Sequence, residues 1–246
     1  MGFGLGSEDG VWPKGLRAVL LFFTLCQSSW ATTESPASGR DDAPAARAPA
    51  EVVQAIVSWI ISSGDSQNLP FVIVDKIAAQ LYVYDARGTP RASTTVLLGL
   101  ARGDHSVPGI GERRIADIRP AERTTPAGRF VGEPGKNIDS EDVIWIDYDA
   151  ALSIHRVRAG PSRERRLERL ASPMPADKRI SYGCVVVPVS FYEQVIAPTF
   201  ARSKGIVYVL PETRSAATVF NFVQRSPPQA GLQQLPALRL SSDSLE

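Results

Sequence analysis

The segments after Phe71 have the composition and the period of β-strands, and this pattern constrains the fold more than any other feature. Residues 71–76 read FVIVDK and residues 79–85 read AQLYVYD, in which Leu81, Val83 and Asp85 oppose Tyr82 and Tyr84. Successive side chains of a strand point to opposite faces, and β-branched and aromatic residues are enriched in strands, so both segments are predicted to be strands. The ARGTP sequence that follows favours a turn, which predicts a hairpin and a neighbouring strand in STTVLLGL.

Further strands are expected around residues 143–148, 151–157 and 205–210, and residues 190–200 have the apolar spacing of a helix. Residues 102–129 are rich in glycine, proline and charge, which predicts a long surface excursion. The chain has 19 glycines and 19 prolines, and this many turn formers favours a β-rich domain over a helical bundle. We therefore expect a mainly β domain with a few short helices over residues 70–211.

The first 31 residues have the pattern of an export signal. Lys14 and Arg17 precede the apolar run AVLLFFTLC, and Ser29-Trp30-Ala31 resembles a cleavage site with small residues. The run is too short for a stable membrane span, so we expect none after cleavage, and we expect an exported protein of the periplasm or cell envelope. A retained anchor is the alternative.

The segments that flank the expected domain differ in their apolar content. Residues 32–50 contain no Ile, Leu, Val, Met or aromatic residue, so we expect a disordered Ala/Pro linker. Residues 51–66 place apolar side chains at helical spacing, which predicts an amphipathic helix laid on the domain. Residues 212–246 are mostly polar and punctuated by proline, and we expect a loose tail.

Charge and the scarcity of ligand residues exclude several classes of function. The 27 Lys and Arg residues balance 26 Asp and Glu residues, which gives no basic surplus for nucleic-acid binding. Two cysteines and two histidines cannot build a Cys-rich zinc module or a disulfide scaffold. Cleavage after Ala31 would leave Cys184 as the single cysteine, which is then an intermolecular partner, a buried spectator or a reactive thiol.

Cys184 lies in Ser181-Tyr182-Gly183-Cys184, between a polar loop and a β-branched run. This predicts a tight turn whose backbone N–H groups converge, as an oxyanion requires. A cysteine nucleophile needs a base, and His155 at the end of an expected strand is a more rigid candidate than His105 in a Gly/Pro-rich loop. Composition alone favours a small buried Cys184 and a hydrogen-bonded strand histidine over a catalytic pair.

An ordered set of motifs resembles the L,D-transpeptidases of bacterial cell walls. That family has an upstream His and a downstream Ser/Thr-His-Gly-Cys, and this chain has Ser153-Ile154-His155 and then Ser181-Tyr182-Gly183-Cys184. The segments IVDKIAAQLYVYDARG and Thr125-Pro126-Ala127-Gly128-Arg129-Phe130 resemble two further elements of the family. The likeness covers about residues 70–211.

The resemblance implies a mixed β-sandwich-like domain and acyl transfer on peptidoglycan stem peptides, with neither metal nor organic cofactor. It implies that Cys184 attacks as the nucleophile, that His155 acts as general base and acid, and that the backbone amides of Tyr182, Gly183 and Cys184 form the oxyanion hole. Ser181 is expected to contact substrate. Carbapenem-type inhibitors are expected to acylate Cys184.

The chain departs from the family pattern at several positions. Tyr182 replaces a histidine, and Val186 replaces an Arg or Asn that would hold substrate. A charged segment, 163–179, lengthens the gap between His155 and Ser181, and its SRERRLERL sequence favours a helical turn or a solvated loop. Arg156 is expected to contact a stem carboxylate, or else to be simply solvated.

Alternative functions remain open at the level of sequence. Water could resolve the same thioester, which would make the chain an L,D-peptidase. The departures at Tyr182 and Val186 also fit a non-catalytic wall-binding domain of the same fold. A redox or metal-responsive thiol is a third alternative, for which the chain lacks a second mature cysteine.

Overall fold

The computed structural model describes residues 50–201 and 204–220. The expected signal of residues 1–31 and nearly all of the expected linker lie outside the described residues. Within the described part, no helix has the length and hydropathy needed to cross a membrane.

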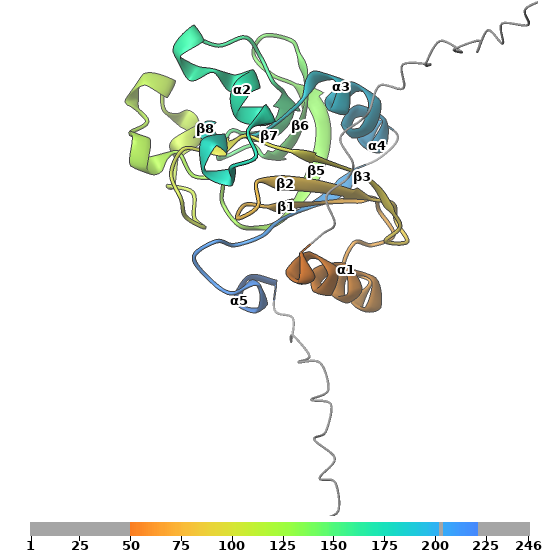
Figure 1. The fold of residues 1–246 in the computed structure, drawn as a ribbon. Helices are drawn as coiled ribbons and strands as arrows, with labels where there is room; N and C mark the ends of the chain where they lie inside the picture. The colour runs from red at the N-terminus through yellow and green to blue at the C-terminus, as the bar shows by residue number, and fades with distance from the viewer. Residues whose placement is uncertain (1–49, 202–203, 221–246) are drawn as a thin grey trace, which may run out of the picture. The chain divides into compact units, whose positions relative to one another are not determined.

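A mixed eight-stranded sheet forms the centre of the described fold (Figure 1). Its strands lie in the order β3-β2-β1-β10-β5-β6-β7-β9, with β1 parallel to β10 and β7 parallel to β9. The bounds are β1 Phe71–Asp75, β2 Gln80–Tyr84, β3 Pro90–Thr95, β5 Gly128–Lys136, β6 Asp142–Asp147, β7 Leu152–Arg156, β9 Val185–Val187 and β10 Gly205–Val209. A small parallel pair, β4 (Leu98–Gly99) and β8 (Arg179–Ser181), lies apart from this sheet. The mainly β prediction is confirmed.

The central strands are apolar on both faces because each face is covered. Val72 and Val74 of β1 belong to one core, while Phe71 and Ile73 belong to a second core on the opposite face. Helix α1 (Glu51–Ser63) and helix α5 (Ala216–Phe220) pack on the second core. The predicted amphipathic helix therefore exists, and it ends at Gly64, whose φ of 69° suits a glycine.

The remaining helical segments are short. They are η1 Ile110–Glu112, η2 Ile115–Asp117, η3 Pro120–Glu122, η4 Ser162–Glu164, α2 Arg166–Ala171 and η5 Pro175–Lys178. The predicted helix at 190–200 is α3 (Val189–Phe191), the π-helical turn η6 (Tyr192–Ile196) and α4 (Ala197–Phe200) in succession. Pro198 lacks an N–H donor, which accounts for the break in the regular α-helical bonding there.

Two sequence predictions need correction. Strand β5 was not expected, because its sequence GRFVGEPGK carries glycines and a proline, yet it pairs with both β10 and β6. Gly132 is required there, since a Cβ would lie 2.7 Å from the Phe200 ring. The segment 102–129 is also more buried than a surface excursion, with Ile110 and Thr125 buried.

Residues 212–220, which the sequence analysis assigns to a loose tail, pack against the described domain. Glu212 is bonded by Arg179, Thr213 donates to Asp104, and Phe220 is buried in the second core. These contacts join residues 212–220 to the ordered structure because they complete a buried ion pair and an apolar core. Residues 221–246 lie outside the described residues.

Candidate active site

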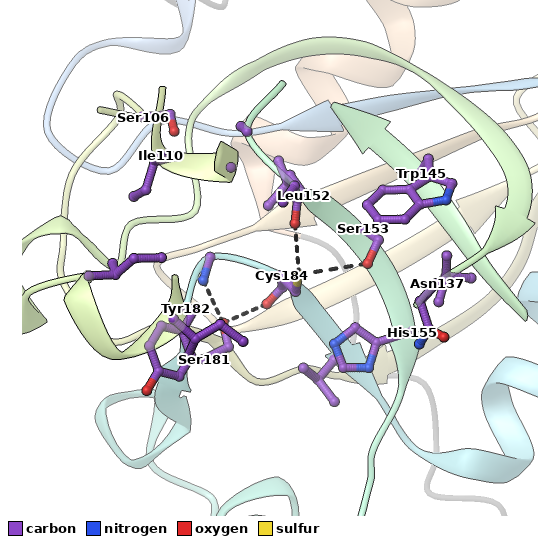
Figure 2. A pocket seen from close by; sticks show the side chains of 18 of the residues that line it. Ser106, Ile110, Asn137, Trp145, Leu152, Ser153, His155, Ser181, Tyr182 and Cys184 are labelled. Atoms are coloured by element: carbon purple, nitrogen blue, oxygen red, sulfur yellow. Dashed lines mark hydrogen bonds between the residues drawn. The ribbon is translucent and has the colours of Figure 1, made fainter. Parts of the chain in front are cut away.

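A cavity of 580 Å³ contains Cys184 and His155 together. Figure 2 shows Cys184 near the centre of the view, with His155, Ser153 and Trp145 on one side of it and Tyr182 on the opposite side. His155 belongs to β7, and Cys184 immediately precedes β9. Because His155 pairs with Val186 in the parallel β7–β9 ladder, the sheet itself holds the two residues close to one another.

The turn that carries Cys184 is held by Ser181. The Ser181 hydroxyl donates to the carbonyl oxygen of Cys184 at 2.7 Å and accepts from the N–H of Gly183 at 3.1 Å. Both bonds are internal to the Ser181–Cys184 turn. Ser181 therefore positions the nucleophile in this structure, whereas the sequence predicted a contact with substrate.

Gly183 is required by its conformation and by its surroundings. Its φ is 140°, and a Cβ there would lie 2.9 Å from the carbonyl oxygen of Thr124. The buried Thr125 hydroxyl donates to the carbonyl oxygen of Gly183 at 2.7 Å and accepts from the N–H of Gly99 at 2.8 Å. Thr125 thus links the cysteine turn to β4 by two hydrogen bonds. The sequence analysis included it only as part of a motif.

The sulfur of Cys184 has two long polar contacts, each at 3.6 Å. One joins Sγ to the hydroxyl of Ser153, and the other runs from Sγ to the carbonyl oxygen of Ala151. The thiol can donate to the carbonyl, and the thiolate can accept from the hydroxyl. Ser153 is therefore a residue of the site that the sequence analysis did not assign, although its place two residues before His155 puts it on the same face of β7.

The surroundings of Cys184 favour its thiolate. Burial alone raises the pKa of this thiol, but the neighbouring His155 imidazole and the backbone and hydroxyl of Ser153 outweigh that cost, so that the pKa is lowered. A lowered thiol pKa increases the fraction of the nucleophilic form near neutral pH.

The tautomer of His155 follows from one hydrogen bond. Its Nδ1 lies 2.8 Å from the carbonyl oxygen of Arg156, and a carbonyl can only accept, so Nδ1 carries a proton. In the neutral ring Nε2 is then unprotonated and able to accept a proton. His105, the other histidine, is exposed on its loop and does not line the cavity.

The predicted oxyanion hole is only partly available. Gly183 already donates its N–H to Ser181, whereas the turn and loop hydrogen bonds of the described residues use neither the N–H of Tyr182 nor that of Cys184. The donors that the turn leaves for an oxyanion are therefore those of Tyr182 and Cys184. The Tyr182 ring lines the cavity and lies 4.1 Å from the guanidinium of Arg123, so it is anchored by a cation–π contact.

Arg156 is not among the residues that line the cavity, and its contact with a stem carboxylate stays a prediction. It follows His155 on β7, so its side chain takes the opposite face, where its guanidinium lies 4.7 Å from the Tyr192 ring. Val186 does line the cavity, where it packs in an apolar cluster with Leu97, Val157 and Leu170.

A buried ionic cluster, formed by Lys76, Asp104, Arg179 and Glu212, contacts the residues that hold the cysteine turn. Lys76 donates to the carboxylate of Asp104 and to the carbonyl oxygen of Thr125, both at 2.8 Å. Arg179 donates through both terminal nitrogens to Glu212, at 3.1 and 2.6 Å. Thr125 bonds to Gly183 of the cysteine turn, and Arg179 begins strand β8, which leads into that turn. The ionic cluster therefore holds the residues on both sides of the turn in place.

No group of three or more His, Cys, Asp and Glu residues that could hold a metal ion occurs within residues 50–201 and 204–220. The cavity brings together a thiol, an imidazole and the backbone of the cysteine turn.

Comparison with known proteins gives likenesses of fold. No protein-family model and no curated protein sequence matches this chain. Among solved structures, the Ldtfm–avibactam carbamoyl enzyme is 17% identical over 58% of this chain and 49% of its own, with a TM-score of 0.35. The helical cell shape determining protein Pgp2 from Campylobacter jejuni is 17% identical over 65% of this chain and 56% of its own, with a TM-score of 0.37.

A third structure is the catalytic domain from E. faecium L,D-transpeptidase. It is 17% identical over 57% of this chain and 95% of its own, with a TM-score of 0.30. The matches thus include the family that the motifs resemble. This chain spans about half the length of the first two chains. At these scores the correspondence is loose, so the residues of the site carry the functional assignment.

Proposed function

We propose that this chain is a cysteine-dependent L,D-transpeptidase that acts on peptidoglycan stem peptides in the periplasm or cell envelope. The observation that carries the proposal is the cavity in which Cys184, with its lowered pKa, shares one end with an imidazole whose Nδ1 proton is fixed by a backbone carbonyl. This is the arrangement of an activated thiol nucleophile and its base.

The first half-reaction follows from these positions. Nε2 of His155 takes the thiol proton, and Sγ attacks the carbonyl of the third, diamino acid residue of the stem. The N–H groups of Tyr182 and Cys184 donate to the oxyanion. The C–N bond to the terminal D-Ala then breaks, the imidazolium returns its proton to the leaving amine, and a thioester remains.

In the second half-reaction the amine of a neighbouring stem attacks the thioester carbonyl. His155 takes a proton from the amine as the new amide bond forms, and the thiol is regenerated. The products are one cross-link between two diamino acids and the enzyme in its starting state. In the free enzyme, the Ser153 hydroxyl and the carbonyl of Ala151 hold Sγ in place before it attacks.

Muropeptide analysis after incubation with the purified protein tests this proposal. New cross-links between diamino acids, absent with Cys184→Ala and Cys184→Ser, are the expected result. Trimmed stems without a new link would contradict the transferase and support the L,D-peptidase alternative.

Intact mass spectrometry with a carbapenem provides a second, independent measurement. The expected result is a covalent adduct on the wild-type chain that disappears in Cys184→Ala. Absence of both an adduct and any muropeptide product would contradict catalysis and favour the wall-binding alternative.

A further inference from the structure

Arginines give the cavity its charge. Arg113, Arg158 and Arg166 all line it, whereas Asp139 is the only carboxylate residue among its lining residues in the described part of the chain. A cavity with this lining favours an anionic ligand. The three arginines differ in how much of each guanidinium remains available.

Two of these guanidinium groups are already occupied at their outer ends. Arg113 donates through both terminal nitrogens to Glu122, at 3.2 and 2.6 Å. Arg158 donates through one terminal nitrogen to Asp139 at 2.8 Å, and its other terminal nitrogen pairs with Glu141. Neither arginine can present its paired N–H edge to a further carboxylate without breaking an existing bond.

Arg166 is held differently. Its Nε donates to the carboxylate of Glu164 at 2.6 Å, and within the described residues no acceptor bonds to its two terminal nitrogens. The side chain is 25% exposed and lies against Gly160, so it is positioned but not covered. A guanidinium fixed through Nε presents its terminal N–H groups as a preorganised fork, the geometry that binds a carboxylate end-on.

Helix α2 is docked firmly enough to hold Arg166 in place. Leu170 of α2 is buried in the cluster that contains Val186 and Leu97. The carbonyl oxygen of Leu170 accepts from the Thr95 hydroxyl at 3.0 Å and from the buried Lys178 at 3.3 Å. Figure 1 shows α2 beside β7 and β8, the elements that flank the site. Val186 thus packs in the same apolar cluster as Leu170 of α2, the helix that carries Arg166.

We propose that Arg166 binds a carboxylate of the peptide substrate and makes the enzyme selective for acidic stem peptides. The inference rests on the proposed function, since it concerns the ligand of the same cavity. The sequence analysis expected Arg156 to provide the positive charge for a stem carboxylate. In this proposal Arg166 provides it, from the charged segment 163–179 that separates His155 from Ser181. Glu164 keeps the guanidinium oriented when the cavity is empty.

Binding to the Cys184→Ala protein, which cannot turn over, tests the inference by calorimetry. The probes are a stem tetrapeptide with free carboxylates and the same peptide with every carboxylate amidated. We expect the acidic peptide to bind more tightly, and we expect Arg166→Gln to weaken its binding at least about tenfold while changing that of the amidated peptide little.

Arg163→Gln is the matched control, because it removes the same charge from an exposed position of the same segment outside the cavity. It should keep the preference for the acidic peptide, and the melting temperatures of both variants should stay near that of the parent. Equal affinity of the parent for both peptides, or an unchanged preference in Arg166→Gln, would overturn the inference.

The inference and the proposed function fail in distinguishable ways. Acylation of wild-type Cys184 without a carboxylate preference in binding would overturn the role of Arg166 alone. Selective binding of the acidic peptide without acylation would count against the transpeptidase and still support the role of Arg166.

Discussion

Two polar clusters flank the same turn and differ in how completely their hydrogen-bonding groups are satisfied. In the ionic cluster, Lys76 uses three donors, on Gly103, Asp104 and Thr125, and the Asp104 carboxylate accepts from Lys76, Glu212 and Thr213. In the thiol cluster, defined as Ser153, His155 and Cys184, the contacts of the sulfur with the Ser153 hydroxyl and with the Ala151 carbonyl are both long, at 3.6 Å.

The difference indicates that the ionic cluster stabilises the fold, whereas the thiol cluster is arranged for reaction. Lys76 and Asp104 are each at most 3% exposed, so their charges are tolerated only because every group is paired. Cys184 is partly exposed and loosely held, which leaves its sulfur free to meet a substrate. Substitutions in the ionic cluster should therefore cost stability, and substitutions in the thiol cluster should cost activity.

The largest effect is expected from His155→Ala. Loss of the base should slow acylation of Cys184 by about 10²–10⁴-fold, with a melting temperature close to that of the wild type. Stopped acylation reactions analysed by intact mass spectrometry measure the rate. His105→Ala is the matched control and should leave the rate nearly unchanged; the reverse result would mean that the base is misassigned.

Asp104→Asn should have the largest effect on stability. It leaves Lys76 buried without its nearest carboxylate, a change that typically costs about 3–5 kcal/mol. Urea unfolding measures the loss. Asp142→Asn removes an exposed ion pair with Lys136 and should cost much less stability than Asp104→Asn, so equal losses in the two variants would contradict the comparison.

The same carboxylate predicts how stability depends on pH. Burial alone would raise the pKa of Asp104, but hydrogen bonds from Lys76, Thr213 and the backbone of Glu212 lower it well below its ordinary value. Because the pKa of Asp104 is lower in the folded state, the ionised carboxylate stabilises the fold at pH values above the unfolded-state pKa of about 4. This contribution to stability is lost as the pH falls through the folded-state pKa. The free energy of unfolding should fall less steeply in acid for Asp104→Asn than for the wild type, and parallel curves would contradict this.

Thr125→Val should affect both properties moderately, since Thr125 contacts Lys76 of the ionic cluster and Gly183 of the cysteine turn. It leaves the carbonyl of Gly183 and the N–H of Gly99 without their partner, at about 1–3 kcal/mol for each group. Acylation should slow as well, because the cysteine turn loses its hydrogen bond from the Thr125 hydroxyl. Thr125→Ser retains the hydroxyl and should restore most of the rate; a Ser variant as slow as Val would argue against the hydrogen bonds.

The smallest effect is expected from Arg156→Gln. Its guanidinium lies over Tyr192 on the face of β7 away from the cavity, so we expect a loss of about 0.5–1 kcal/mol in stability. Steady-state acylation assays should show less than about a threefold change in rate. A large change in KM would mean that Arg156 reaches the substrate after all.

The sequence predicts the parts of this molecule that depend on local pattern. Strand composition and period locate β1, β2, β6 and β7, and the cysteine and the strand histidine that the sequence singles out, Cys184 and His155, line one cavity. Strand β5 escapes prediction because Gly132 is required by close packing against Phe200 and Gly135 by close packing against Trp145, which are tertiary effects. Ser153 could have been found from its two-residue spacing to His155.

The ionic cluster could not be predicted, because its members are far apart in the chain. Lys76 and Asp104 are separated by 28 residues, and Asp104 and Thr213 by 109. No local periodicity links such positions, and a charged residue in isolation predicts a solvated side chain. The same distance effect hid the contacts of Glu212 with Arg179 and of Thr213 with Asp104.

The central claim is that His155 activates Cys184, and the pH dependence of Cys184 alkylation by iodoacetamide tests it most directly. In the wild type the rate should rise with an inflection below the ordinary thiol pKa of about 8.5, and in His155→Ala the inflection should move up toward that value. The same inflection in both proteins, or one above 8.5 in the wild type, would contradict the account.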